Sequence, residues 1–216
     1  MDLYFTRHGK TEWNLERRFQ GMKGDSPLLP SSFLEIQALG QHIAEVPFEH
    51  IYCSSAPRAQ ITAQEINKQL TKSVAITPTD ALLEMGYGIL EGQSIDEMLA
   101  KYPTELGNMR FHMDQYDPTP FEGETVAAMI VRMTAFITEK VGAHTGPVLF
   151  VGHGSSMTAA VQALLGKPAS DYRSMGGLYN NSLTILETET KQLPYQLKLW
   201  NDASFLEKDA SLDSLL

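Results

Sequence analysis

Short apolar runs alternate with longer amphipathic segments along this chain, and this alternation limits the folds that the chain can adopt. The runs are typical of buried strands, and the segments between them have the apolar spacing of helices. Strands that are separated by helices pair in parallel, with helices packed on both faces of the sheet. The sequence therefore predicts an α/β fold, a three-layer sandwich with a mostly parallel central sheet. The expected strands are 3–5, 50–53, 74–76, 148–151, 182–187 and 195–200, and the expected helices are 31–46, 58–70, 95–102, 105–115, 122–141 and 155–165.

The length of 216 residues suits one α/β domain with its own hydrophobic core. We expect this domain to span residues 1–200, because no linker or internal repeat divides that part of the chain. Residues 93–121 form an insertion that could be a lid over a ligand or a packed excursion with solvated charges, and we favour the lid. The tail at 201–216 mixes apolar and acidic residues, which agrees with either a docking helix or disorder.

The net charge of −9 argues against nucleic acid or an anionic membrane surface as a partner. An anion-binding site must therefore be a local concentration of positive charge. The single cysteine, Cys53, excludes an internal disulfide, and its place in an apolar strand predicts a small buried side chain. The chain shows neither a signal-peptide pattern nor an apolar run of about 18 residues, so we expect a cytoplasmic protein.

The first strand is followed by Arg7-His8-Gly9, three residues whose chemistry suits a phosphate group. Arginine presents a planar set of donors that matches phosphate oxygens, and histidine is a nitrogen nucleophile near neutral pH. Glycine lets a bulky anion approach the backbone. The motif therefore predicts a phosphate site with His8 as its nucleophile.

Three further segments carry groups that such a site requires. Arg58 follows the strand at 50–53 near a helix N-terminus, where anions are favoured, and His153 follows the strand at 148–151. Glu84 adds a carboxylate in a glycine-rich loop. Ligands of open α/β sheets bind beyond the carboxyl ends of the strands, so we expect these groups to converge there.

The chain carries a series of short motifs whose order and spacing match those of one protein family. They are Arg7-His8-Gly9, Thr11, Trp13-Asn14, Gln20-Gly21, Ser26-Pro27-Leu28, Ser54-Ser55, Arg58-Ala59, Glu84, Gly88, Glu91-Gly92 and Val151-Gly152-His153-Gly154. Together they resemble the histidine phosphatase superfamily, specifically its phosphoglycerate mutase-like branch. The resemblance runs from Leu3 to about Thr184. One departure is Ser155-Ser156, because a second glycine is usual after the second histidine of that family.

The resemblance implies a role for each matching residue. His8 would become phosphorylated and Glu84 would act as the proton donor, with no metal ion and no cofactor. The residues implied to hold the phosphoryl group are Arg7, Arg58 and His153, and the further phosphate or substrate contacts implied are Asn14, Gln20, Gly21 and Gly154.

The chemistry also sets protonation requirements. The attacking nitrogen of His8 must carry no proton, and we expect its other ring nitrogen to bond to a backbone carbonyl such as that of Gly152 or Gly154. We expect a protonated His153, which would add positive charge beside the arginines. Glu84 must be protonated when it meets the leaving group, and repulsion by a bound phosphate dianion favours that state.

These residues favour a phosphomonoester hydrolase whose partner is a small phosphorylated metabolite. The alternative is a 2,3-bisphosphoglycerate-dependent phosphoglycerate mutase, which must hold a bisphosphate, and the insertion offers only Lys101 and Arg110 as obvious cations. A metalloenzyme built on His8, His153 and Glu84 is disfavoured because two arginines would repel a dication. An inactive phospho-binding module is disfavoured because both reactive residues are present, and the sequence leaves a homodimer open.

Overall fold

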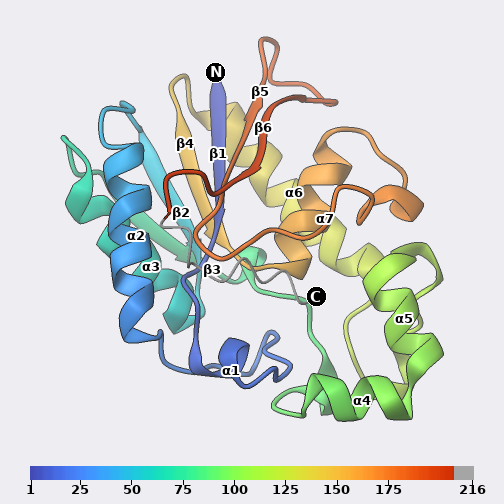
Figure 1. Ribbon diagram of the computed structural model, residues 1–216. Coiled ribbons are helices and arrows are strands. Elements are labelled where there is room, and N and C mark those ends of the chain that lie inside the picture. Colours follow the sequence, from blue (N-terminus) through green and yellow to red (C-terminus); the bar gives the residue numbers. More distant parts are fainter. Residues whose placement is uncertain (207–216) are drawn as a thin grey trace.

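The computed structural model describes residues 1–206. Its strands are β1 (Asp2–Arg7), β2 (His50–Ser54), β3 (Ile76–Thr79), β4 (Val148–Gly152), β5 (Leu183–Glu187) and β6 (Gln196–Asp202). They form one six-stranded sheet in the order β3-β2-β4-β1-β5-β6 (Figure 1). The first four strands in this order are parallel, and β5 and β6 are antiparallel to their neighbours at one edge.

Helices cover both faces of the sheet, which confirms the predicted three-layer α/β fold (Figure 1). They are α1 (Glu12–Leu15), α2 (Pro30–His42), α3 (Pro57–Gln69), α4 (Ile95–Lys101), α5 (Pro103–Phe111), α6 (Val126–Ala143) and α7 (Ser155–Leu164). Alternation along β1 divides the core, because Leu3 and Phe5 pack with α6 and α7 whereas Tyr4 packs with α2 and α3. Cys53 joins the second core as predicted, and burial raises the pKa of its thiol to about 12.

Parallel pairing brings the segments that carry the candidate residues to one edge of the sheet. Arg7 of β1 pairs with Gly152 of β4, so His8 and His153 leave the sheet at the same level. On the other side of β4, strand β2 leads into α3, which begins at Pro57. The carboxyl ends of three neighbouring strands therefore supply one site.

Local hydrogen bonds move two elements away from their predicted positions. The third strand begins at Ile76 rather than at residue 74, because the Asn67 side chain pairs with both the carbonyl and the N–H group of Val74. The long helix begins at Val126 rather than at residue 122, where the hydroxyl of Thr125 caps its first turn. The short helix α1 has no counterpart in the sequence prediction.

The insertion at 93–121 packs onto the main core. Its helices α4 and α5 lie at one end of the molecule, below α6 and α7 in Figure 1. Met109, Met113 and Phe121 are buried in the same apolar cluster as the inner face of α6. Its movement as a lid stays a prediction.

The last described residues are held against the sheet and α2. Strand β6 continues to Asp202, so the first residues of the predicted tail belong to the sheet. The ring of Phe205 stacks on His42 with centroids 4.5 Å apart. The tail prediction for residues 207–216 falls outside the described residues. No helix within residues 1–206 combines the length and apolar character needed to cross a membrane.

Glu49, which precedes β2, forms hydrogen bonds to the segment that precedes β4. Its carboxylate accepts hydrogen bonds from the Thr145 hydroxyl at 2.8 Å, the Gly146 N–H group at 2.6 Å and Nδ1 of His144 at 2.8 Å. Side-chain hydrogen bonds from Thr145 and His144 lower the pKa of Glu49 from 4.5 to about 2. The contribution of this carboxylate to stability must therefore depend on pH.

The substitution Glu49→Gln is expected to lower the Tm at pH 7. The stabilisation is fully present above about pH 4.5, the unfolded pKa, and is lost as the pH falls toward about 2, because the folded carboxyl then becomes protonated as well. The melting curves of the wild type and of Glu49→Gln should therefore differ at pH 7 and converge at the acid end of this range. Glu139→Gln is the matched control, because Glu139 is largely exposed and forms a surface ion pair with Lys140. A Tm difference between the wild type and Glu49→Gln that stays the same at every pH would contradict this role for Glu49.

Candidate active site

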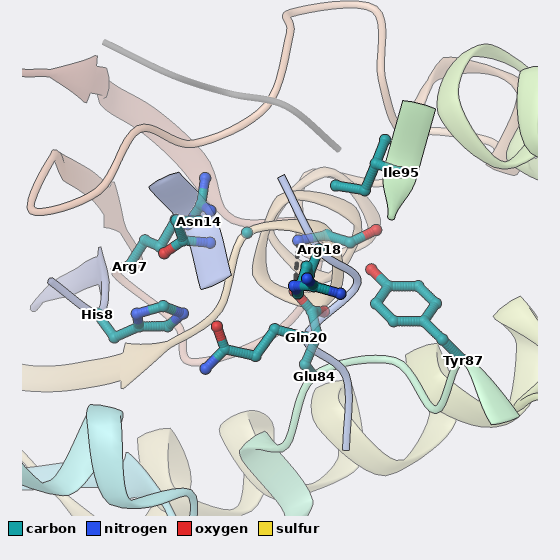
Figure 2. Close-up of a pocket in the computed structure, with 10 residues that line it drawn as sticks. Arg7, His8, Asn14, Arg18, Gln20, Glu84, Tyr87 and Ile95 are labelled. Carbon is teal, nitrogen blue, oxygen red and sulfur yellow. Dashed lines mark hydrogen bonds between the residues drawn. The ribbon is translucent and has the colours of Figure 1, made fainter. Parts of the chain in front are cut away.

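A pocket opens at the carboxyl edge of the parallel strands, and Figure 2 shows the side chains of His8, Gln20 and Glu84 converging on it. Its lining residues are Arg7, His8, Asn14, Arg18, Gln20, Glu84, Tyr87, Ile95, Gly154 and Ser155. Most of the predicted site residues therefore share one pocket. Arg58 and His153, which are almost fully buried, do not line this pocket but contact His8, and the Gly21 carbonyl accepts a hydrogen bond from Arg58.

The ring of His8 has a defined tautomer. Its Nδ1 lies 2.7 Å from the Gly9 carbonyl, and a carbonyl only accepts, so we assign the proton to Nδ1 and the lone pair to Nε2. The acceptor expected from the sequence, the carbonyl of Gly152 or Gly154, is wrong. The Gly152 carbonyl instead accepts the backbone N–H of His8 at 2.9 Å, because β1 and β4 are paired up to this point.

The surroundings of His8 keep the ring neutral. Burial lowers the pKa of His8 well below its usual value, and the positive charges of Arg58 and Arg7 add to this effect. The Nε group of Arg58 donates to Nε2 of His8 at 3.2 Å and so orients the ring. A neutral ring with an unprotonated Nε2 meets the requirement for a nucleophile.

Arg58 is held by the loop at 21–25. Its Nη1 donates to the Gly24 carbonyl at 2.8 Å and pairs with the carboxylate of Asp25 at 2.8 Å. Its Nη2 donates to the Gly21 carbonyl at 3.1 Å. Gly21 itself is tightly enclosed, because a Cβ there would lie 2.7 Å from the Met85 carbonyl oxygen. These contacts fix both the position and the charge of Arg58.

His153 is neutral, and the sequence expectation of a protonated ring is wrong for this structure. Its Nδ1 lies 3.0 Å from Nη2 of Arg58, which can only donate, and its Nε2 donates to the Ser54 hydroxyl at 2.7 Å. Burial lowers the pKa of His153 well below its usual value, and the charge of Arg58 is the next largest cause. His153 therefore acts here as an acceptor that holds Arg58.

Glu84 is clamped at the N-terminus of α7. Its Oε1 accepts the N–H groups of Met85 at 2.9 Å and Ser156 at 2.7 Å, whereas within residues 1–206 Oε2 accepts one, that of Ser155, at 2.9 Å. A helix N-terminus favours a carboxylate, because the first N–H groups have no partner within the helix. The backbone N–H groups of Ser155 and Ser156, which glycine would supply equally, thus position Glu84, and Oε2 retains a lone pair for a ligand.

Arg7 and Gly154 fit closely together. Nη1 of Arg7 donates to the Leu178 carbonyl at 2.9 Å, which fixes one end of the guanidinium. A Cβ on Gly154 would lie 3.0 Å from Cζ of Arg7, closer than ordinary packing allows. Glycine at this position therefore leaves room for the arginine beside the pocket.

Gln20 and Asn14 present amide groups whose carbonyl ends are already bound. The Thr11 hydroxyl lies 2.7 Å from Oε1 of Gln20, and the backbone N–H of Thr11 donates to Oδ1 of Asn14 at 3.1 Å. Nε2 of Gln20 is buried without a hydrogen-bond partner among residues 1–206. Both amides therefore have NH₂ groups with which to bind oxygen atoms of a ligand.

Four lining residues were not predicted: Arg18, Tyr87, Ile95 and Ser155. Tyr87 follows Glu84 by three residues, so its loop position was a usable signal. Arg18 lies two residues before Gln20, so its position was also a usable signal. Its Nη1 donates to the Gly92 carbonyl at 3.0 Å. Ile95 comes from the insertion, and no local pattern placed it at the pocket.

Comparison with known proteins decides the family. The model of the histidine phosphatase superfamily (branch 1) matches residues 3–203, nearly the whole chain. The chain belongs to the histidine phosphatase superfamily. The resemblance found in the sequence is thereby confirmed.

Relatives of this histidine phosphatase include both mutases and phosphatases. A 2,3-bisphosphoglycerate-dependent phosphoglycerate mutase of Brucella anthropi is 35% identical over 76% of this chain and 81% of its own length. Phosphoserine phosphatase 1 of Hydrogenobacter thermophilus is 28% identical over 88% of both chains. Among solved structures, YhfR of Bacillus stearothermophilus is 29% identical, with a TM-score of 0.86 over 95% of this chain and 99% of its own. The chain is therefore an enzyme of this superfamily.

Proposed function

We propose that this enzyme hydrolyses a phosphomonoester of a small metabolite through a phosphohistidine on His8. One observation carries the proposal: a neutral His8 with an unprotonated Nε2 shares a pocket with the carboxylate of Glu84. Nucleophile and proton donor are the two reactive groups that stepwise phosphoryl transfer needs. The residues around them supply cations and donors for the phosphoryl oxygens.

In the first half-reaction, the hydrogen bond from Nε of Arg58 to Nε2 of His8 breaks, and the N–H group turns to a phosphoryl oxygen. The freed lone pair of Nε2 forms a bond to phosphorus as the bond from phosphorus to the ester oxygen breaks. Arg7, Arg58 and the amide of Gln20 stabilise the charge on the other three phosphoryl oxygens. Glu84, protonated beside the bound dianion, gives its proton to the leaving oxygen through Oε2. The products are a phosphohistidine and a free alcohol.

In the second half-reaction, water takes the place of the alcohol. Glu84, now a carboxylate, accepts a proton from the water as its oxygen bonds to phosphorus and the bond from phosphorus to nitrogen breaks. Inorganic phosphate leaves, and both His8 and Glu84 return to their first state. One carboxylate thus serves as acid and then as base.

The insertion supports hydrolysis over mutase turnover. A mutase must neutralise two phosphates of its bisphosphate intermediate while it keeps water away. Lys101 lies over the ring of Tyr102, Arg110 lies over the exposed ring of Phe111, and neither cation lines the pocket. The relative from Brucella anthropi keeps the mutase as the second candidate.

A pair of assays on one preparation tests this choice. We expect phosphate release from at least one small phosphomonoester to exceed the interconversion of 3- and 2-phosphoglycerate, measured with bisphosphoglycerate as primer. A chelator should leave the rate unchanged, since the proposed steps use only side chains. Interconversion about tenfold faster than phosphate release on every ester would establish the mutase instead. Loss of activity to a chelator and recovery with a divalent ion would contradict the metal-free mechanism.

A further inference from the structure

Arg132 is a cation of α6 that the proposed mechanism does not use, and it holds the backbone of the segment that carries Glu84. Its Nη1 donates to the carbonyls of Ala81 at 3.0 Å and Leu83 at 2.8 Å, and its Nη2 donates to the carbonyl of Glu84 at 3.0 Å. The side chain of Arg132 is only 20% exposed, so water competes little for these donors. One guanidinium therefore fixes three carbonyl groups within four consecutive residues.

Glu124, which lies just before α6, fixes this guanidinium in turn. Its carboxylate accepts hydrogen bonds from Nε of Arg132 at 2.7 Å and from Nη2 at 2.8 Å, a bidentate pair that depends on the planar donor set of arginine. Glu124 also bonds directly to Gly86, since its N–H group donates to the Gly86 carbonyl at 2.7 Å and its Oε2 accepts the Gly86 N–H group at 3.3 Å. Residues 81–86, here called the Glu84 loop, are therefore tied to the beginning of α6.

Two neighbouring helices thus hold opposite ends of Glu84. Helix α6 packs beside α7 (Figure 1), and Arg132 on α6 binds the backbone carbonyl of Glu84 while the N–H groups of Ser155 and Ser156 on α7 bind its carboxylate. Arg132 itself does not line the pocket, so it touches no substrate there. A general acid must lie within hydrogen-bond reach of the oxygen that it protonates, so a small shift of the Glu84 loop would separate the proton from the leaving group.

We propose that Arg132 is a positioning residue for the proton donor and sets the place from which Glu84 protonates the leaving oxygen. The inference rests on the proposed function, because it takes Glu84 as the acid of the first half-reaction. An alkoxide is a strong base that leaves only with a proton, whereas a nitrophenolate is a weak base that leaves as the anion. Loss of Arg132 should therefore slow the cleavage of alkyl phosphates and spare that of nitrophenyl phosphates.

Two esters of similar size, benzyl phosphate and p-nitrophenyl phosphate, test this role. The measured quantity is kcat/KM for benzyl phosphate divided by kcat/KM for p-nitrophenyl phosphate. Each kcat/KM covers the steps up to the release of the alcohol or phenol, so the hydrolysis of the phosphohistidine does not enter the ratio, and a loss of folded enzyme lowers both values equally. We expect Arg132→Gln to lower the ratio about tenfold or more, because a positioned general acid contributes about 10²–10⁴-fold to the rate.

Lys140→Gln is the matched control, because it removes another cation of α6, one that forms a surface ion pair with Glu139. It should leave the ratio unchanged. Arg132→Lys separates charge from geometry, since lysine keeps the charge but carries its donors on one nitrogen, and the ratio should fall in this variant too. If Arg132→Gln does not fold, the double variant with Glu124→Gln leaves no unpaired carboxylate and should lower the same ratio. A wild-type ratio in Arg132→Gln or in Arg132→Lys would overturn the positioning role while phosphate release continues.

Failure of the proposed function gives a different result, because the wild type then cleaves neither ester. Amide hydrogen exchange still measures the position of Glu84 without catalysis. The N–H groups of Ser155 and Ser156 precede the first hydrogen bond within α7, so their protection reports their bonds to the Glu84 carboxylate. In Arg132→Gln both should exchange about fivefold faster or more, the factor for one lost hydrogen bond, while amides later in α7 stay protected. Unchanged exchange of these two amides would overturn the positioning role.

Discussion

Substitution of His8 by alanine is expected to reduce kcat/KM for every accepted phosphomonoester by at least about 10⁴-fold, the scale seen when a covalent nucleophile is removed. His153, whose ring centroid lies 5.2 Å from that of His8, cannot take over the attack, because its two ring nitrogens are bonded to Arg58 and Ser54. The lowered pKa of His8 adds a pH signature. Protonation of Nε2 would stop the reaction. In the pH–rate profile of the wild-type enzyme, the loss of activity due to protonation of His8 should therefore begin well below pH 6.5.

Rapid quenching with radiolabelled ester should trap phosphate on His8. A phosphorus–nitrogen bond is labile in acid and stable in base, and peptide mapping locates the label. His112→Ala is the matched control, because His112 is exposed on the insertion and does not line the pocket. Full activity in His8→Ala, or an acid-stable phosphate on another residue, would remove His8 from the mechanism.

The sequence predicted the framework of the site because that framework depends on local patterns. The short apolar runs at 3–5 and 148–151 identified β1 and β4, and their parallel pairing followed from the helices between them. Once the strands are paired, His8 and His153 must meet at the carboxyl edge. Such reasoning requires no knowledge of how loops fold.

The protonation state of His153 and the lining residue that comes from the insertion could not be predicted in the same way. The neutral state of His153 follows from complete burial beside Arg58, which only the packed structure reveals. Ile95 reaches the pocket from the insertion, and the packing of the insertion against the rest of the molecule leaves no periodic pattern in the sequence. The amide clamp on Glu84 was foreseeable, because residue 155 begins a predicted helix and helix N-termini bind carboxylates.

Arg58→Lys is expected to reduce kcat by about 10² to 10³-fold, the loss typical of one transition-state donor. Lysine keeps the positive charge but carries it on one nitrogen, whereas the guanidinium uses all three of its nitrogens. In this structure those nitrogens contact His8, His153 and the loop at 21–25. A lysine cannot satisfy these acceptors together, so the His8 ring loses its orientation and the loop loses its anchor.

Steady-state kinetics with Asp25→Asn distinguishes charge from geometry at this position. Asp25 pairs with Nη1 of Arg58 at 2.8 Å, and asparagine can still accept that hydrogen bond. We therefore expect Asp25→Asn to cost much less activity than Arg58→Lys, although it removes the partner charge. If Arg58→Lys loses less than about threefold, Arg58 contributes only charge, and the hydrogen bond to Nε2 of His8 is not what orients the nucleophile. If both variants lose activity equally, the ion pair rather than the planar donor set controls the site.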